Sequence, residues 1–140
     1  MALTLNITLG NRIKLAERLP KFGTIEYMYG IKSIKQTLVG FGNTQMINWR
    51  IIPYGDTLIT ALPDTGTSIT LSDEQIKVFA QYINERNMQG SVEVDEAELF
   101  KQILEAEAEI IAAEQAAAAA AAQEMMNQVE QEQGQEGGGE

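Results

Sequence analysis

The chain has 140 residues, of which 44% are hydrophobic, and a formal net charge of −10 at neutral pH. It contains no cysteine and no histidine, which excludes disulfide frameworks, zinc–thiolate sites and cysteine nucleophiles and removes the commonest general base. Since we find neither a long apolar run nor a secretory signal pattern, we expect a protein that is not secreted and that does not enter a membrane.

Negative charge is concentrated in the last third of the chain. Residues 1–90 carry nine Lys or Arg and seven Asp or Glu, a net charge of +2, whereas residues 91–140 carry one Lys and thirteen acids, a net charge of −12. A near-neutral body followed by an acidic segment is typical of a chain with a separate interaction tail or solubilising tail.

The first strands of the body are predicted from alternation of apolar and polar residues. Residues 3–9 alternate with the period of a half-buried strand, and residues 11–19 fit a strand or a short helix capped by Asn11 equally well. Residues 24–41 fit a strand with a kink near Gly30, followed by a second strand or a short helix. Further strands are expected at residues 46–52, 57–62 and 67–71.

Turns separate these strands, and a helix is expected to close the body. The turns at Pro53 and Pro63 indicate a small antiparallel sheet or barrel of about five or six strands. Ser72 and Gln75 have the spacing of a capping box, which predicts a helix over residues 73–88. Its apolar face comprises Ile76, Phe79, Ala80 and Ile83. The expected fold class is therefore α+β, with a β-rich body over residues 1–90 and one packing helix.

A long helix is predicted over residues 91–133. This segment contains seven consecutive alanines, residues 116–122, and otherwise mostly Glu, Gln, Leu and Met, which are good helix formers. Residues 134–140 are rich in glycine, and we expect this end to be flexible.

Apolar residues in this helix recur at alternating spacings of four and three, which is typical of a helix-packing seam. The predicted oligomer or partner contacts are Leu99, Ile103, Ala106, Ile110 and Ala113. A second row runs beside them, formed by Phe100, Leu104, Ile111, Ala118, Ala121 and Met125. The alternative is a solvated rod that packs on nothing. If the seam associates, Ile103→Glu should lower the oligomeric state without unfolding the body.

No pattern in the sequence predicts catalysis, a cofactor or a metal site. The serines lack the sequence context of known nucleophiles, and no complete phosphate-binding glycine loop is present. Basic residues near aromatic residues in the first third of the chain are possible contacts for nucleic acid, namely Arg12, Lys14, Lys32 and Lys35. The small net charge of the body argues against this interpretation.

We therefore expect a non-enzymatic structural or assembly protein. The composition and the long helix suit a small virion-associated or capsid-associated protein of the bacteriophage type, located in the virion or the host cytoplasm. Its expected partners are further copies or other structural subunits. The alternatives are a single-stranded nucleic-acid-binding protein with an autoinhibitory acidic tail, and an acidic inhibitor of a host protein.

Overall fold

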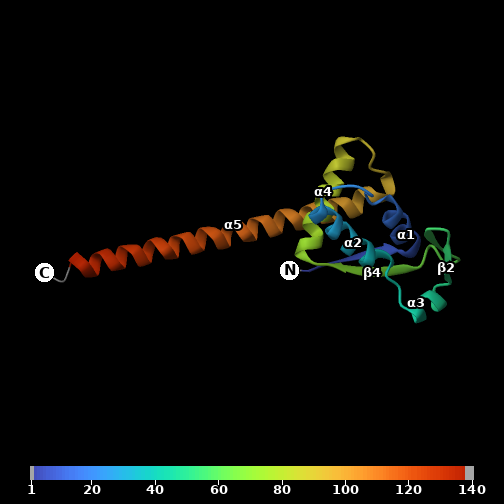
Figure 1. Ribbon diagram of the computed structural model, residues 1–140, viewed down its shortest axis with the longest axis horizontal. Helices are drawn as coiled ribbons and strands as arrows, with labels where there is room; N and C mark the ends of the chain where they lie inside the picture. Colours follow the sequence, from blue (N-terminus) through green and yellow to red (C-terminus); the bar gives the residue numbers. More distant parts are fainter. Residues whose placement is uncertain (1, 138–140) are drawn as a thin grey trace. The chain divides into compact units, whose positions relative to one another are not determined.

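The protein is described by a computed structural model that covers the backbone of residues 2–137 and the side chains of residues 2–130. Its contacts form two units, residues 1–107 and residues 108–140. We call the first unit the body. The elements in chain order are β1 (Leu3–Thr8), α1 (Leu9–Arg18), α2 (Ile25–Val39), α3 (Asn43–Asn48), β2 (Ile51–Tyr54), β3 (Thr57–Thr60), β4 (Gly66–Leu71), α4 (Asp73–Met88) and α5 (Val94–Gly137) (Figure 1). The expected α+β class is confirmed.

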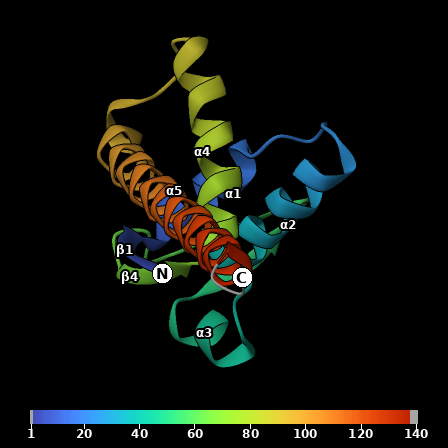
Figure 2. The same ribbon diagram turned by 90° about the vertical axis from the view of Figure 1, so that its left-hand side faces the viewer.

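The described strands form two small antiparallel sheets. In the first, β1 pairs with β4, so that Leu5 lies opposite Ile69 and both side chains are buried. The predicted strands at residues 3–9 and 67–71 are therefore confirmed, and Figure 2 shows them side by side. In the second, β2 and β3 form a hairpin closed by Gly55 and Asp56, where Gly55 adopts a φ of 61° that suits a tight primed turn.

Residues 25–39 form one helix, α2. The prediction of a strand with a kink near Gly30, followed by a second strand or a short helix, is therefore wrong. The buried α2 residues Tyr27, Ile31, Ile34 and Leu38 follow one another at spacings of four, three and four, which is the helical period. Residues 25–31 happen to alternate as well, which concealed that period. Thr24 begins the helix, because its side chain accepts a hydrogen bond from the Tyr27 N–H at 3.3 Å.

Two further segments of the body are helical. Residues 9–18 form α1, and its N-cap is Thr8 rather than the expected Asn11, since the Thr8 side chain accepts from the Asn11 N–H. Residues 43–48 form the short helix α3, so the strand predicted at residues 46–52 begins only at Ile51. These helices take the place of the additional strands. The described body has two small two-stranded sheets with helices, rather than one sheet or barrel of about five or six strands.

The core of the body lies between the β1–β4 sheet and helices α1, α2 and α4. The predicted capping box is confirmed: Ser72 Oγ accepts from the Gln75 N–H at 3.2 Å, and Gln75 Oε1 accepts from the Ser72 N–H at 2.9 Å. The Gln75 amide also donates to Ser33 Oγ, which fixes α4 to α2. The largest fully buried side chains are Leu5, Leu9, Ile34, Leu38, Leu71, Ile76, Phe79, Ile83 and Ile103.

Helix α5 contributes to both units. Its first part, residues 94–107, belongs to the body, and we call it the α5 base; there the Phe100 ring lies 6.1 Å from the Phe79 ring. The body thus continues past residue 90, where we expected its end, to Glu107. The rest of the helix, residues 108–137, we call the α5 tail. Of the glycine-rich end expected to be flexible, residues 138–140 lie outside the described residues.

Among the described residues, no helix combines the length and the hydropathy that a membrane span requires.

Candidate functional site

A network of charged side chains joins the α5 base to α4 and α1. Arg86 of α4 donates two hydrogen bonds to the Glu96 carboxylate, at 2.8 Å and 2.7 Å, and both side chains are largely buried. Glu96 Oε1 also accepts from the Glu93 N–H at 3.1 Å, which satisfies a donor at the beginning of α5. The Arg86 guanidinium lies 5.7 Å from the centre of the Phe100 ring. Glu96 therefore caps α5 and pairs with α4 at the same time.

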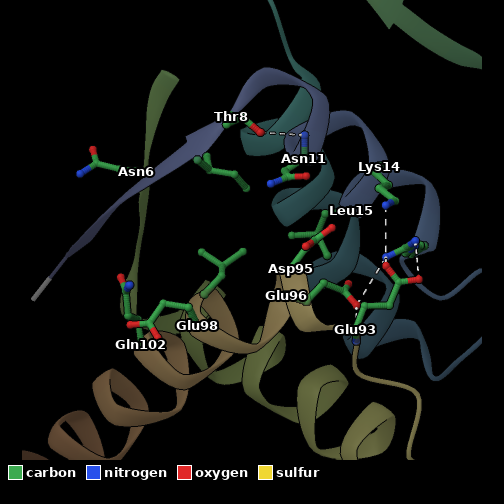
Figure 3. A pocket seen from close by; sticks show the side chains of 13 residues that line it. Asn6, Thr8, Asn11, Lys14, Leu15, Glu93, Asp95, Glu96, Glu98 and Gln102 are labelled. Carbon is green, nitrogen blue, oxygen red and sulfur yellow. Dashed lines mark hydrogen bonds and ion pairs between the residues drawn. The ribbon is translucent and has the colours of Figure 1, made fainter. Parts of the chain in front are cut away.

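Two cations of α1 complete this network (Figure 3). Arg18 lies 2.8 Å from Glu93 and 3.4 Å from Glu96, and Lys14 lies 3.7 Å from Glu93. The hydroxyl of Tyr82 donates to the Arg18 carbonyl and accepts from Arg86. The α5 base is thus held at its first turn by side chains from two other helices.

The network lowers the pKa of both carboxyl groups. Burial alone would raise the pKa of Glu96, but hydrogen bonds from Arg86 and from the Glu93 N–H outweigh burial and lower it. For Glu93, the hydrogen bond from Arg18 is the main cause that lowers its pKa. Both carboxylates are therefore stabilised in the charged form, which is unsuited to a general acid or base near neutral pH.

The pocket beside this network is small, and four of the charged side chains that line it pair with one another: Lys14, Arg18, Glu93 and Glu96. Its volume is 210 Å³, below the range of about 300–1,000 Å³ typical of small-molecule sites. In the part of the chain with described side chains, no group of three or more Asp or Glu is placed to hold a metal ion. We therefore interpret this network as the attachment of α5 to the body, a role that the sequence analysis did not assign to it.

The four predicted nucleic-acid contacts do not form one surface. Arg12 is buried, and its guanidinium donates to the carbonyls of Leu38 and Thr37 at 2.7 Å and 3.1 Å. Lys14 is engaged by Glu93. Only Lys32 and Lys35, both exposed on α2, line a common cleft.

That cleft has a volume of about 680 Å³, and we call it the basic cleft. Three exposed lysines border it: Lys21, Lys32 and Lys35. Within the described side chains, no hydrogen bond or ion pair engages these lysines. Two acids also border it, and one of them, Glu17, already accepts a hydrogen bond from Thr57. The apolar lining comes from α1, α2 and β3 and includes Met28, Val39 and Leu58.

The predicted seam of α5 is divided between buried and exposed positions. Ile103 is fully buried in the body, so its side chain is not available to a partner. The Ile110 side chain is 4% exposed. Leu99 and Ala106 are half-buried, and Ala113 is exposed. Because Ile103 is a core residue, Ile103→Glu would destabilise the body, and it does not separate association from folding as we expected.

The second row of apolar residues remains accessible along the α5 tail. Every residue from 111 to 130 is exposed. Ile111, Met125 and Val129 are 39%, 68% and 51% exposed, and all three lie on one side of the helix. Continuing the spacings of four and three gives a stripe, which we call the α5 stripe, formed by Ile111, Ala118, Ala122, Met125 and Val129 with Gln115 as its one polar position.

No protein-family model, curated protein or solved structure matches this chain.

Proposed function

We propose that the protein is a non-enzymatic assembly component that associates through the α5 stripe. The observation that supports this proposal is the exposure of residues 111–130, a run of helix in which no described side chain is buried. An exposed helix that carries Met125, Met126 and Val129 is stabilised when a partner covers these side chains.

The composition of the stripe suits close packing. The alanines at 118 and 122 allow the backbone of a partner to approach, and the larger residues at its two ends supply most of the apolar area. Complete burial of a Met or Val side chain contributes about 1.5–3 kcal/mol, so Met125 and Val129 are the expected anchors of the contact. The charged network at the α5 base supports this role, because it holds the helix on its body.

The setting we favour is a virion or capsid of the bacteriophage type, with other copies or other structural subunits as partners. Its support is the composition, which lacks His and Cys, together with the long exposed helix. The alternative of single-stranded nucleic-acid binding is weakened, because Arg12 is buried and Lys14 is paired with Glu93.

The proposal is tested by changing the two sides of the same helix. Met125→Glu with Val129→Glu places two charges on the α5 stripe, whereas Gln123→Glu with Asn127→Glu places the same charges on the opposite side. Glu is a good helix former, so both variants keep the helix, which circular dichroism checks.

We expect light scattering to give a mass above the 15.4 kDa of one chain for the unmodified protein and for the Gln123/Asn127 variant. The Met125/Val129 variant should be monomeric. If both variants keep the oligomeric mass, the α5 stripe is not the contact and the proposal is wrong.

A further inference from the structure

We propose that the basic cleft of one copy receives the α5 stripe of a second copy, so that the chains join head to tail. This inference rests on the proposed function and names the surface that covers the stripe. It arises from two features of one chain, each of which combines apolar side chains with charges of opposite sign to the other.

The basic cleft has the properties of a groove that binds an amphipathic helix. Helices dock in grooves with an apolar lining, and polar residues at the edge fix their orientation. Here Met28, Val39 and Leu58 are half-exposed in the lining, while Lys21, Lys32 and Lys35 stand at its border without a partner among the described side chains. The volume of about 680 Å³ is large enough for several side chains.

The α5 tail has the complementary chemistry. Residues 108–137 contain six Glu and no Lys or Arg, a net charge of −6. Glu130 lies beside the α5 stripe, where it would approach the lysines at the border of a basic cleft. Oppositely charged groups around an apolar contact select the partner and fix its register.

Pairing of two α5 tails is the less favourable arrangement. It would bring a charge of −6 against a second charge of −6, with no basic residue in either segment to compensate. It would also leave the three lysines and the apolar lining of the basic cleft uncovered. Insertion of the tail into the cleft avoids the repulsion between two tails. It also covers the lysines and the apolar lining of the cleft.

A head-to-tail contact has a consequence for the assembly. The two surfaces of such a contact differ, so each copy keeps one free cleft and one free stripe until the chain of copies closes. The product is a closed ring or an open filament rather than a two-fold symmetric dimer.

The test uses two full-length variants, each defective in one surface. In the cleft variant, Lys32→Glu and Lys35→Glu reverse the charge at the border. In the stripe variant, Met125→Glu and Val129→Glu disrupt the apolar contact. Lys101→Glu, an exposed position outside the cleft, controls for the loss of a lysine, and Gln123→Glu with Asn127→Glu controls for added charge on α5.

We expect each variant alone to be monomeric and an equimolar mixture of the two to form a 1:1 dimer, because the intact stripe of one enters the intact cleft of the other. Both controls should assemble as the unmodified protein does. Sedimentation velocity over a hundredfold range of concentration distinguishes these species.

Three other outcomes would overturn the inference, and they distinguish a wrong head-to-tail contact from a wrong proposed function. If the stripe variant is monomeric and the cleft variant assembles normally, the stripe binds elsewhere on a second copy, and only the head-to-tail inference is wrong. If both variants are monomeric and their mixture is too, the two surfaces do not meet. If the stripe variant keeps the oligomeric mass, the proposed function is wrong as well.

Discussion

At the scale of single residues, several charged side chains of the body bind partners within the body. Arg12 looks like a surface cation in the sequence, yet its guanidinium lies under the last turn of α2, bonded to the carbonyls of Thr37 and Leu38. It also lies 4.8 Å from the centre of the Phe41 ring. Burial lowers the pKa of Arg12, but its carbonyl partners are acceptors at the negative end of a helix, where a cation is favoured.

Arg12→Lys should reduce the free energy of unfolding by about 1–3 kcal/mol, because an ammonium group cannot reproduce the forked set of donors. Urea unfolding at neutral pH measures this change. Arg50→Lys is the matched control, since Arg50 is exposed, and it should alter the stability by no more than about 0.5 kcal/mol. Equal effects of the two substitutions would show that the bonds of Arg12 contribute nothing specific.

Glu96 gives a prediction about pH. Its pKa in the folded chain lies below the ordinary value of 4.5, so the unfolded chain takes up the proton first as the pH falls. The stabilisation by Glu96 is therefore complete above about pH 4.5 and is lost as the pH falls through the lower, folded pKa.

Glu96→Gln should lower the stability at pH 7 by about 1.5–3 kcal/mol and make it fall less between pH 7 and pH 3. Urea unfolding at the two pH values measures both effects. Glu98→Gln is the control, because Glu98 lies two residues further along α5 and is exposed. This variant should keep the full dependence of stability on pH. Parallel losses in the unmodified protein and the Glu96 variant would contradict this account.

At the scale of elements, the sequence patterns that correctly predicted helices and strands each lie within a few consecutive residues. The Ser72–Gln75 capping box identified α4, and alternation identified β1. Helix α2 was missed because residues 25–31 alternate by coincidence, and the burial that distinguishes the two periods depends on contacts with α4 and α1. The seam of α5 is a similar case. The spacing of apolar residues predicts both rows, but only the fold shows that Ile103 packs inside the body.

Gly30 marks the close approach of α2 and α4. A β-carbon at this position would lie 2.6 Å and 2.8 Å from the two γ-methyl groups of Val78. Although alanine favours a helix over glycine by about 1 kcal/mol, we expect Gly30→Ala to lower the stability by about 1–3 kcal/mol through this overlap.

The matched test is a double-mutant cycle with Val78→Ala, which removes the methyl groups in question. Thermal or urea unfolding should show that the double variant is more stable than the sum of the two single changes predicts. Additive effects would mean that the helices separate without cost and that Gly30 is not required for their contact.

At the scale of the whole molecule, all of the basic residues lie in the body, whereas the charged residues of the α5 tail are all acidic. The body carries the lysines of the basic cleft, and the α5 tail carries six Glu without a basic residue. Composition alone revealed this asymmetry and the long helix. It did not reveal the basic cleft, because Lys21, Lys32 and Leu58 come from distant segments that meet only in the fold.

The charge complementarity also predicts a dependence on salt. Ion pairs at the border of an exposed cleft are screened as the ionic strength rises, so the proposed contact should weaken between about 0.05 M and 0.5 M sodium chloride. Association that strengthens with salt would indicate a purely apolar contact and would argue against the lysines as partners of the tail.

Assembly of this chain through its long helix is tested most directly by the mass of the unmodified protein over a wide range of concentration. Sedimentation equilibrium at low salt should show a mass that rises from 15.4 kDa toward multiples of that value. A mass that stays at 15.4 kDa at every concentration would contradict self-assembly and would leave the α5 tail as a solvated helix.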